Sequence, residues 1–131
     1  PPHSQKSTPP LRILPVLEKL KAAYLLWFAQ YQILPKAHRY SIGQKVDCFF
    51  ADAIEAVATA TFLPPVEKQP WVRLAIRKIE ASKVFLLVLW ETGSLETKHY
   101  AALSVPIDEV GKILGGWNGQ IERTLRENRR K

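Results

Sequence analysis

The chain has 131 residues, a length typical of a single domain whose hydrophobic core needs no disulfide or metal. It has 19 Lys and Arg against 12 Asp and Glu, and the resulting formal charge of +7 favours polyanionic partners, although a basic surface without a specific ligand is an equal alternative. No apolar run approaches the roughly 18 residues needed to cross a bilayer, and the first residues lack a secretory signal. We therefore expect a cytoplasmic protein with no membrane partner.

The predicted elements follow a proline-rich start, residues 1–10, which we expect to be disordered. A first helix is predicted over about residues 15–32, because Pro15 suits the first helical position and apolar residues recur at helical spacing. Pro35 is expected to end it. The stripe predicted to face the core is Leu17, Leu20, Tyr24, Phe28 and Tyr31.

A second helix is predicted from Ser41 to the residues before Pro64. Ser41 and Gln44 have the spacing of a capping box, in which two side chains satisfy backbone amides of the first turn. Cys48 lies within this apolar pattern and, as the only cysteine, is expected to be a small buried residue without a disulfide partner. The inward positions are expected to be Ile42, Val46, Phe49, Ala53, Ala56 and Ala60.

A third helix is predicted from about Pro70 to Glu91, with Gly93 as its C-terminal cap. The run VFLLVLW within it could form a short buried strand, but its continuity with a longer uninterrupted pattern favours helix. A fourth helix is predicted over 96–126. Pro106 either kinks this helix or divides it in two, and we favour one kinked helix.

These segments predict an all-α fold, an up-down-up-down four-helix bundle spanning residues 11–126 and followed by a basic tail, 127–131. The third and fourth helices have apolar or small faces beyond the one that a bundle core requires. Such extra faces indicate a homo-oligomer, with a monomer of unusually wide core as the alternative.

Glycines at 111, 115 and 119 are spaced four apart and so share a face of the fourth helix, at a cost of about 1 kcal/mol each relative to alanine. A face without side chains lets another backbone approach closely, either within the chain or from a second copy. We expect Gly115→Leu to disrupt the fold or the assembly.

Reactive groups are sparse. His3, His38 and His99 are isolated, and no spacing typical of a zinc or di-iron site occurs. Neither a nucleophile with a base nor a phosphate-binding glycine loop can be identified. We predict a protein that is not an enzyme and that uses no cofactor or metal.

The basic residues cluster in three places, and together they predict a surface for a phosphate backbone. One group surrounds the loop between the first two helices, one lies near the start of the third helix, and one lies at the end of the chain. The residues are Lys36, Arg39 and Lys45, then Arg73, Arg77 and Lys78, then Arg123, Arg126, Arg129 and Arg130. Each group alone is more often a solvated face than a binding site. Because an antiparallel bundle puts the first loop near the end of the third helix, we expect the basic surface to run along the side of the bundle.

The stretch VPIDEVGKILGGW, with LPKAHRYSIGQKV and RKIEASKVFLLVLWETG before it, resembles a particular family of four-helix bundles. That family includes the accessory variability determinant (Avd) proteins of diversity-generating retroelements and the intervening-sequence proteins encoded within bacterial ribosomal RNA genes. The resemblance covers roughly residues 14–121, and the segment 109–117 is its most specific part.

The resemblance implies a homopentameric barrel that binds the reverse transcriptase and the template RNA and supports mutagenic cDNA synthesis, while the partner performs the polymerase chemistry. It places Lys36, Arg39, Arg77 and Lys78 at the RNA or the polymerase, and it makes Gly111, Gly115 and Trp117 packing residues. The alternative from the same family is a structural or protein-interaction module without a nucleic-acid role. A neighbouring reverse-transcriptase gene would favour the first function, and a position inside a ribosomal RNA gene the second.

Overall fold

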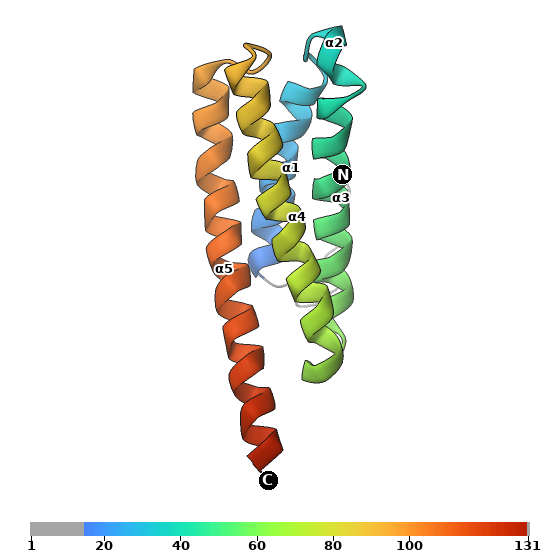
Figure 1. The fold of residues 1–131 in the computed structure, drawn as a ribbon, viewed down its shortest axis with the longest axis vertical. Helices are drawn as coiled ribbons and strands as arrows, with labels where there is room; N and C mark the ends of the chain where they lie inside the picture. The colour runs from blue at the N-terminus through green and yellow to red at the C-terminus, as the bar shows by residue number, and fades with distance from the viewer. Residues whose placement is uncertain (1–14, 131) are drawn as a thin grey trace, which may run out of the picture.

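The computed structural model describes residues 15–130, which form five α-helices and no β-strand within that range. The four long helices are α1 (Pro15–Tyr31), α3 (Ile42–Thr61), α4 (Pro65–Glu91) and α5 (Thr97–Arg130), and they run side by side in alternating directions (Figure 1). α2 (Lys36–Arg39) is a single turn between α1 and α3. The all-α prediction is confirmed. The segment predicted to be disordered lies outside the described residues.

The helices pack in a ring, because α3 and α5 each contact both α1 and α4. Two ends result. We call the end that holds α2 and the turn 92–96 between α4 and α5 the loop end, and the end that holds the first turns of α4 and residues 117–130 of α5 the open end (Figure 1). The hydrogen bond between His38 Nδ1 and Ser94 Oγ, 2.6 Å, connects α2 to that turn at the loop end.

Within residues 15–130, four helices enclose the core of the loop end, whereas three enclose the core of the open end. Trp27 of α1 is fully buried and stacks against Phe50 of α3, with ring centroids 6.4 Å apart. The α1 stripe predicted from the sequence is wrong in part, because Val16, Leu20, Ala23 and Trp27 form the buried face and Phe28 is 41% exposed. At the open end a separate small core contains Ala60, Val72 and Ile121 from α3, α4 and α5.

Helix ends lie near the prolines and glycines from which they were predicted, but the structure corrects three of the predicted helix ends. α4 begins at Pro65 rather than near Pro70, because Pro65 occupies the first turn, where no amide donor is needed. Ser41 makes no cap hydrogen bond; its hydroxyl instead donates to the carbonyl of Ala37 in the unpredicted α2. α5 continues through Pro106 as one helix and reaches Arg130, so residues 127–130 are helical.

The turn after α4 requires its glycine. Gly93 has φ of +82°, a conformation that side chains with a Cβ rarely adopt. The amides of Ser94 and Leu95 then donate to the carbonyl of Leu89 at 2.9 and 3.0 Å. This cap confirms the predicted end of the helix, and VFLLVLW is helical as favoured.

Candidate nucleic-acid interface

The basic start of α4 and the basic end of α5 meet at the open end. Arg73 Nη2 of α4 lies 2.8 Å from Glu122 Oε2 of α5, and both side chains are about half exposed. One turn away, Gln69 Nε2 donates to Asn118 Oδ1 at 3.4 Å. Two clusters that are about 50 residues apart in the sequence therefore form one region of the surface.

Most of the cations at the open end are exposed. Among residues 15–130, no Asp or Glu side chain lies within ion-pair distance of the guanidinium groups of Arg77, Arg123, Arg126, Arg129 or Arg130. Their charge is therefore not neutralised by a neighbour in the described part of the chain. We name the surface formed by Arg73, Arg77, Arg123, Arg126, Arg129 and Arg130 the arginine end.

A cation and an aromatic ring that the sequence did not predict as a pair lie beside the arginine end. The Lys68 ammonium is 5.5 Å from the centroid of the Trp117 ring. Lys68 was not among the predicted binding residues, because α4 was predicted to begin at Pro70, two residues later. Trp117 is half-buried and packs against both cores.

Lys45 and Lys78 lie together on the side of the bundle, as members of different helices. Their ammonium groups are each 5.7 Å from the centroid of the Phe49 ring. Lys78 also pairs with Asp52 at 3.1 Å, so its charge is partly compensated. The predicted basic surface along the side is thus limited here to two lysines around one aromatic ring.

The predicted residues at the loop end have unequal roles. Lys36 is exposed on α2. The Arg39 guanidinium donates to the carbonyl of Leu34 through Nη2 at 2.9 Å and through Nε at 3.3 Å, and therefore closes the turn between α1 and α2. Arg39 has a structural function in this turn, which leaves Lys36 as the freer cation of this group.

Among residues 15–130, the glycine face of α5 has no close backbone neighbour. A Cβ at position 115 would meet no described atom within 4 Å, one at position 111 only the side chains of Lys83 and Glu80, and one at position 119 only the side chain of Arg123. Within residues 15–130, the interpretation in which these glycines admit a backbone of the same chain is therefore wrong. Contact with a second copy stays a prediction.

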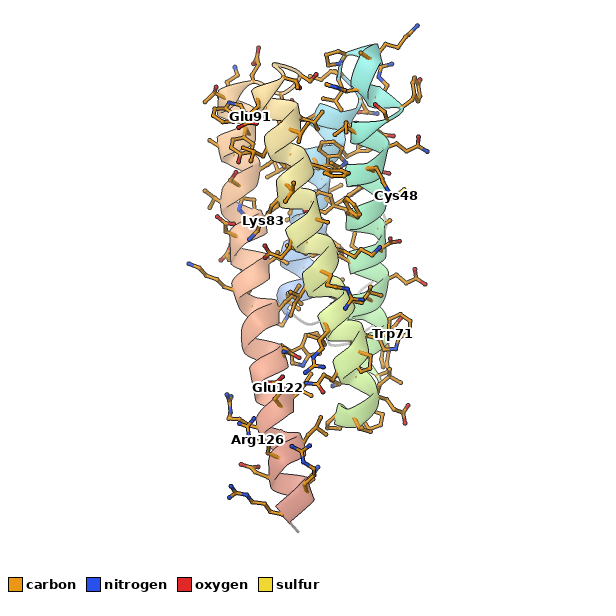
Figure 2. The ribbon with its side chains drawn as sticks, viewed as in Figure 1. Cys48, Trp71, Lys83, Glu91, Glu122 and Arg126 are labelled. Carbon is orange, nitrogen blue, oxygen red and sulfur yellow. The ribbon has the colours of Figure 1, made fainter. Side chains whose placement is uncertain are left out.

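The structure provides no constellation for catalysis that we can identify in the described range. Residues 15–130 contain no group of three or more His, Cys, Asp or Glu side chains placed to hold a metal ion. Cys48 is exposed on α3, not buried as predicted, because the core face of that helix passes through Val46 and Phe50 (Figure 2).

Two shifted pKa values have structural causes. Burial, together with a hydrogen bond to Asp47, raises the pKa of Tyr24 to about 12. Burial alone would lower the pKa of Lys83, but hydrogen bonds to Asp108 and Glu80 outweigh it and raise the pKa. Both groups therefore keep their protons at neutral pH, and neither is available as a general base.

No protein-family model matches the chain, and no curated protein matches it significantly. Within the described residues, no helix combines the length and the apolar character needed to cross a membrane.

Proposed function

We propose that this protein is a non-catalytic accessory protein of a diversity-generating retroelement, which binds template RNA and the reverse transcriptase and supports mutagenic cDNA synthesis in the cytoplasm. The observation that supports this proposal best is the arginine end. Five of its six guanidinium groups have no acidic partner among residues 15–130, and the sixth joins α4 to α5. Such a surface is suited to bind a phosphate backbone, because cationic side chains contact phosphates without reading the base sequence. The resemblance of residues 109–117 to the Avd proteins supplies the pathway.

The RNA part of the proposal is tested by salt-dependent binding. Arg123, Arg126 and Arg130 are changed together to Ala, and binding to a structured RNA is measured between 50 and about 200 mM salt. We expect weaker binding and a salt slope smaller by about 2, because three phosphate contacts are lost. The matched control changes Lys19, Lys21 and Lys98 to Ala, which removes the same charge from α1 and from the loop-end half of α5.

Equal effects of the two triple variants would mean that only net charge matters, and the arginine end would then have no specific role. If the unchanged protein binds no RNA at any salt concentration, the nucleic-acid part of the proposal fails altogether. Copurification with a reverse transcriptase encoded by a neighbouring gene tests the remaining part.

The proposed homopentamer has support from the outer face of α1. Residues 22–35 contain no charged side chain; Leu25 and Leu26 of α1 are 66% and 48% exposed, and Ile33, in the turn just after the helix, is 70% exposed. Exposed apolar side chains of this kind are typical of an interface between proteins. We expect light scattering to give the mass of a pentamer, and Leu26→Glu to lower that mass. An unchanged mass for the variant would exclude this face from the assembly.

The same apolar face favours the second candidate function, a structural or protein-interaction module without a nucleic-acid role. RNA binding at low salt distinguishes the two functions. The structural module would assemble normally but would not bind RNA. Because the α1 face and the arginine end lie on different helices, the Leu26→Glu and arginine variants separate assembly from binding.

A further inference from the structure

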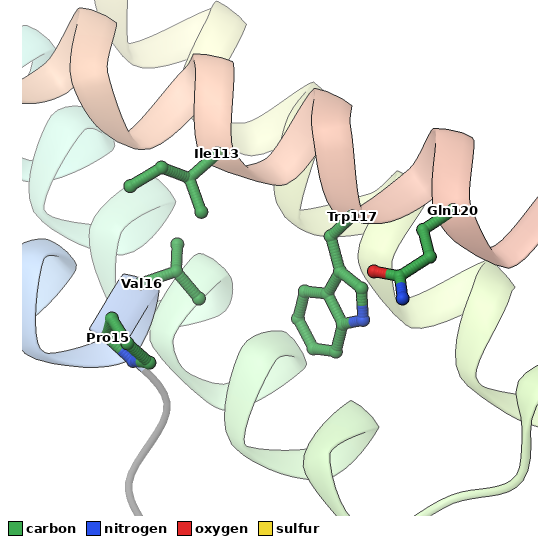
Figure 3. A pocket seen from close by; sticks show the side chains of 5 residues that line it. All are labelled: Pro15, Val16, Ile113, Trp117 and Gln120. Carbon is green, nitrogen blue, oxygen red and sulfur yellow. The ribbon is translucent and has the colours of Figure 1, made fainter.

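A groove of about 350 Å³ lies where α1 begins (Figure 3). Pro15 and Val16 of α1 form one side of this groove, and Ile113, Trp117 and Gln120 of α5 extend across from the other side. With the exception of the Gln120 amide, the groove is lined by apolar side chains. We name it the Trp117 groove.

The apolar side chains of the Trp117 groove are incompletely covered. Ile113 and Trp117 both pack against the main core, yet both remain half-buried. A second cavity of about 150 Å³ is also lined by Trp117, together with Lys68 and Ile121. The Trp117 ring therefore has space beside it in two places.

The difference in helix length explains the groove. α1 has 17 residues and α5 has 34, so at about 1.5 Å per residue α1 is roughly half as long. Lys19 pairs with Glu109 at 3.0 Å, which aligns the first turns of α1 with the middle of α5. Beyond Trp117, α5 has no described α1 residue opposite it, so three of the helices in residues 15–130 enclose this part of the bundle.

We propose that residues 11–14, with the sequence LRIL, occupy the Trp117 groove and cover Ile113 and Trp117 with Leu11, Ile13 and Leu14. This segment directly precedes Pro15, which is itself part of the groove wall. Four residues can extend by about 14 Å, and a segment already attached at the groove loses little further entropy when it binds. A second copy of the chain would have to supply the same apolar surface at the full entropic cost of association.

Charge is compatible with this assignment. Residues 1–14 contain Lys6 and Arg12 and no Asp or Glu, and the segment LRIL places its single charge among three apolar residues. The described residues that line the groove include no carboxylate, so the apolar residues, not an ion pair, would hold the segment. Binding of the segment in the groove would also add positive charge near the arginine end, a consequence that rests on the proposed function.

Fluorine NMR of the 5-fluorotryptophan-labelled protein tests the inference without reference to any ligand. The four tryptophans give four signals, and the Trp117→Phe variant identifies the signal of Trp117. The double variant Leu11→Ser with Ile13→Ser should shift the Trp117 signal, increase its H2O–D2O isotope shift, and lower the melting temperature by about 5 °C. The signal of Trp27, which is fully buried at the other end of α1, should not change.

The matched control is Pro9→Ser with Pro10→Ser, which makes two similar changes just before the proposed segment. If the Leu11 and Ile13 changes move the Trp117 signal no more than this control does, the inference is wrong. A Trp117 signal that depends on protein concentration would assign the groove to a second copy. A signal that moves only when oligouridylate is added would assign it to a nucleobase. Either result would overturn the proposal.

A double-mutant cycle keeps the test decisive if the serine variant is strongly destabilised. In a Trp117→Ala background, the Leu11 and Ile13 changes should lower the melting temperature by much less than in the unchanged protein, because their partner is gone. Equal decreases in both backgrounds would show that residues 11–14 act without contacting Trp117.

Discussion

The two ends of the bundle differ in how they use their aromatic residues. At the loop end four helices surround Trp27, whose ring stacks on Tyr31 at 5.4 Å and whose Nε1 donates to Asp47 at 3.2 Å. At the open end three helices leave Trp117 half-buried beside a groove and a lysine. The comparison suggests that stability is concentrated at the loop end, while the open end retains surface for binding. Four measurements test this difference between the two ends.

The largest difference is expected between the two tryptophans. Trp27→Ala removes a fully buried ring and one donor to Asp47, and should lower the free energy of unfolding by about 3–5 kcal/mol. Trp117→Ala removes a half-buried ring, and its decrease in the free energy of unfolding should be less than about half of the decrease for Trp27→Ala. Urea unfolding followed by circular dichroism measures both changes. Equal losses would show that the two ends are equally important for stability.

The second prediction uses the pKa of Tyr24, which belongs to the loop end. Because its folded-state pKa of about 12 is above the ordinary value of 10, the unfolded chain releases this proton first. The associated stability is complete below pH 10 and is lost as the pH rises from about 10 to 12. The expected loss is about 2 kcal/mol.

Unfolding experiments at pH 8, 10 and 11.5 measure this loss. Tyr24→Phe should reduce the slope above pH 10, with a residual slope from Tyr31, whose pKa burial also raises. Tyr40→Phe is the control, since that side chain is 68% exposed and should leave the slope unchanged. If Tyr24→Phe leaves the slope as steep as in the unchanged protein, the Tyr24 hydroxyl does not control the alkaline stability.

Much of the fold could be predicted because particular residues permit only one local structure. Gly93 ended α4 as expected, and the run VFLLVLW before it is helical, as its continuity with a longer pattern favoured. The stripe of α1 was not predictable, because Leu25, Leu26 and Phe28 make that helix apolar on nearly every side. Periodicity cannot then identify the face that Trp27 occupies.

The candidate site was predictable in composition but not in arrangement. The arginines of α4 and α5 were all identified, yet the pairing of Arg73 with Glu122 depends on how the helices pass each other. The role of Arg39 also depended on geometry, since only the folded turn brings the Leu34 carbonyl to its guanidinium. Sequence spacing describes one helix at a time, and these contacts join separate elements.

The third prediction compares two glycines in helices. A Cβ at Gly43 would lie 2.6 Å from Leu34 Cδ1 and 3.0 Å from the His38 carbonyl oxygen, so Gly43→Ala should cost about 1–2 kcal/mol despite the better helix former. A Cβ at Gly115 would meet no atom of residues 15–130 within 4 Å, so Gly115→Ala should stabilise the isolated chain by about 0.5–1 kcal/mol. Thermal unfolding measures both effects. A destabilising Gly115→Ala would indicate that another molecule covers this face.

The smallest effect on stability is expected at the ion pair of the open end, and it separates stability from binding most clearly. Arg73 and Glu122 are 52% and 41% exposed, so Glu122→Gln should lower the free energy of unfolding by at most about 0.5 kcal/mol. The same change frees Arg73 for a phosphate, and the salt slope of RNA binding should become steeper by about 0.7.

Glu109→Gln is the matched control. Glu109 also forms an exposed ion pair, with Lys19, but on the side of α5 that faces α1, so this change removes one carboxylate far from Arg73. If both variants strengthen RNA binding equally, the gain comes from net charge alone. If only Glu122→Gln strengthens it, Arg73 belongs to the binding surface, and the ion pair restrains binding while adding little to the stability of the open end.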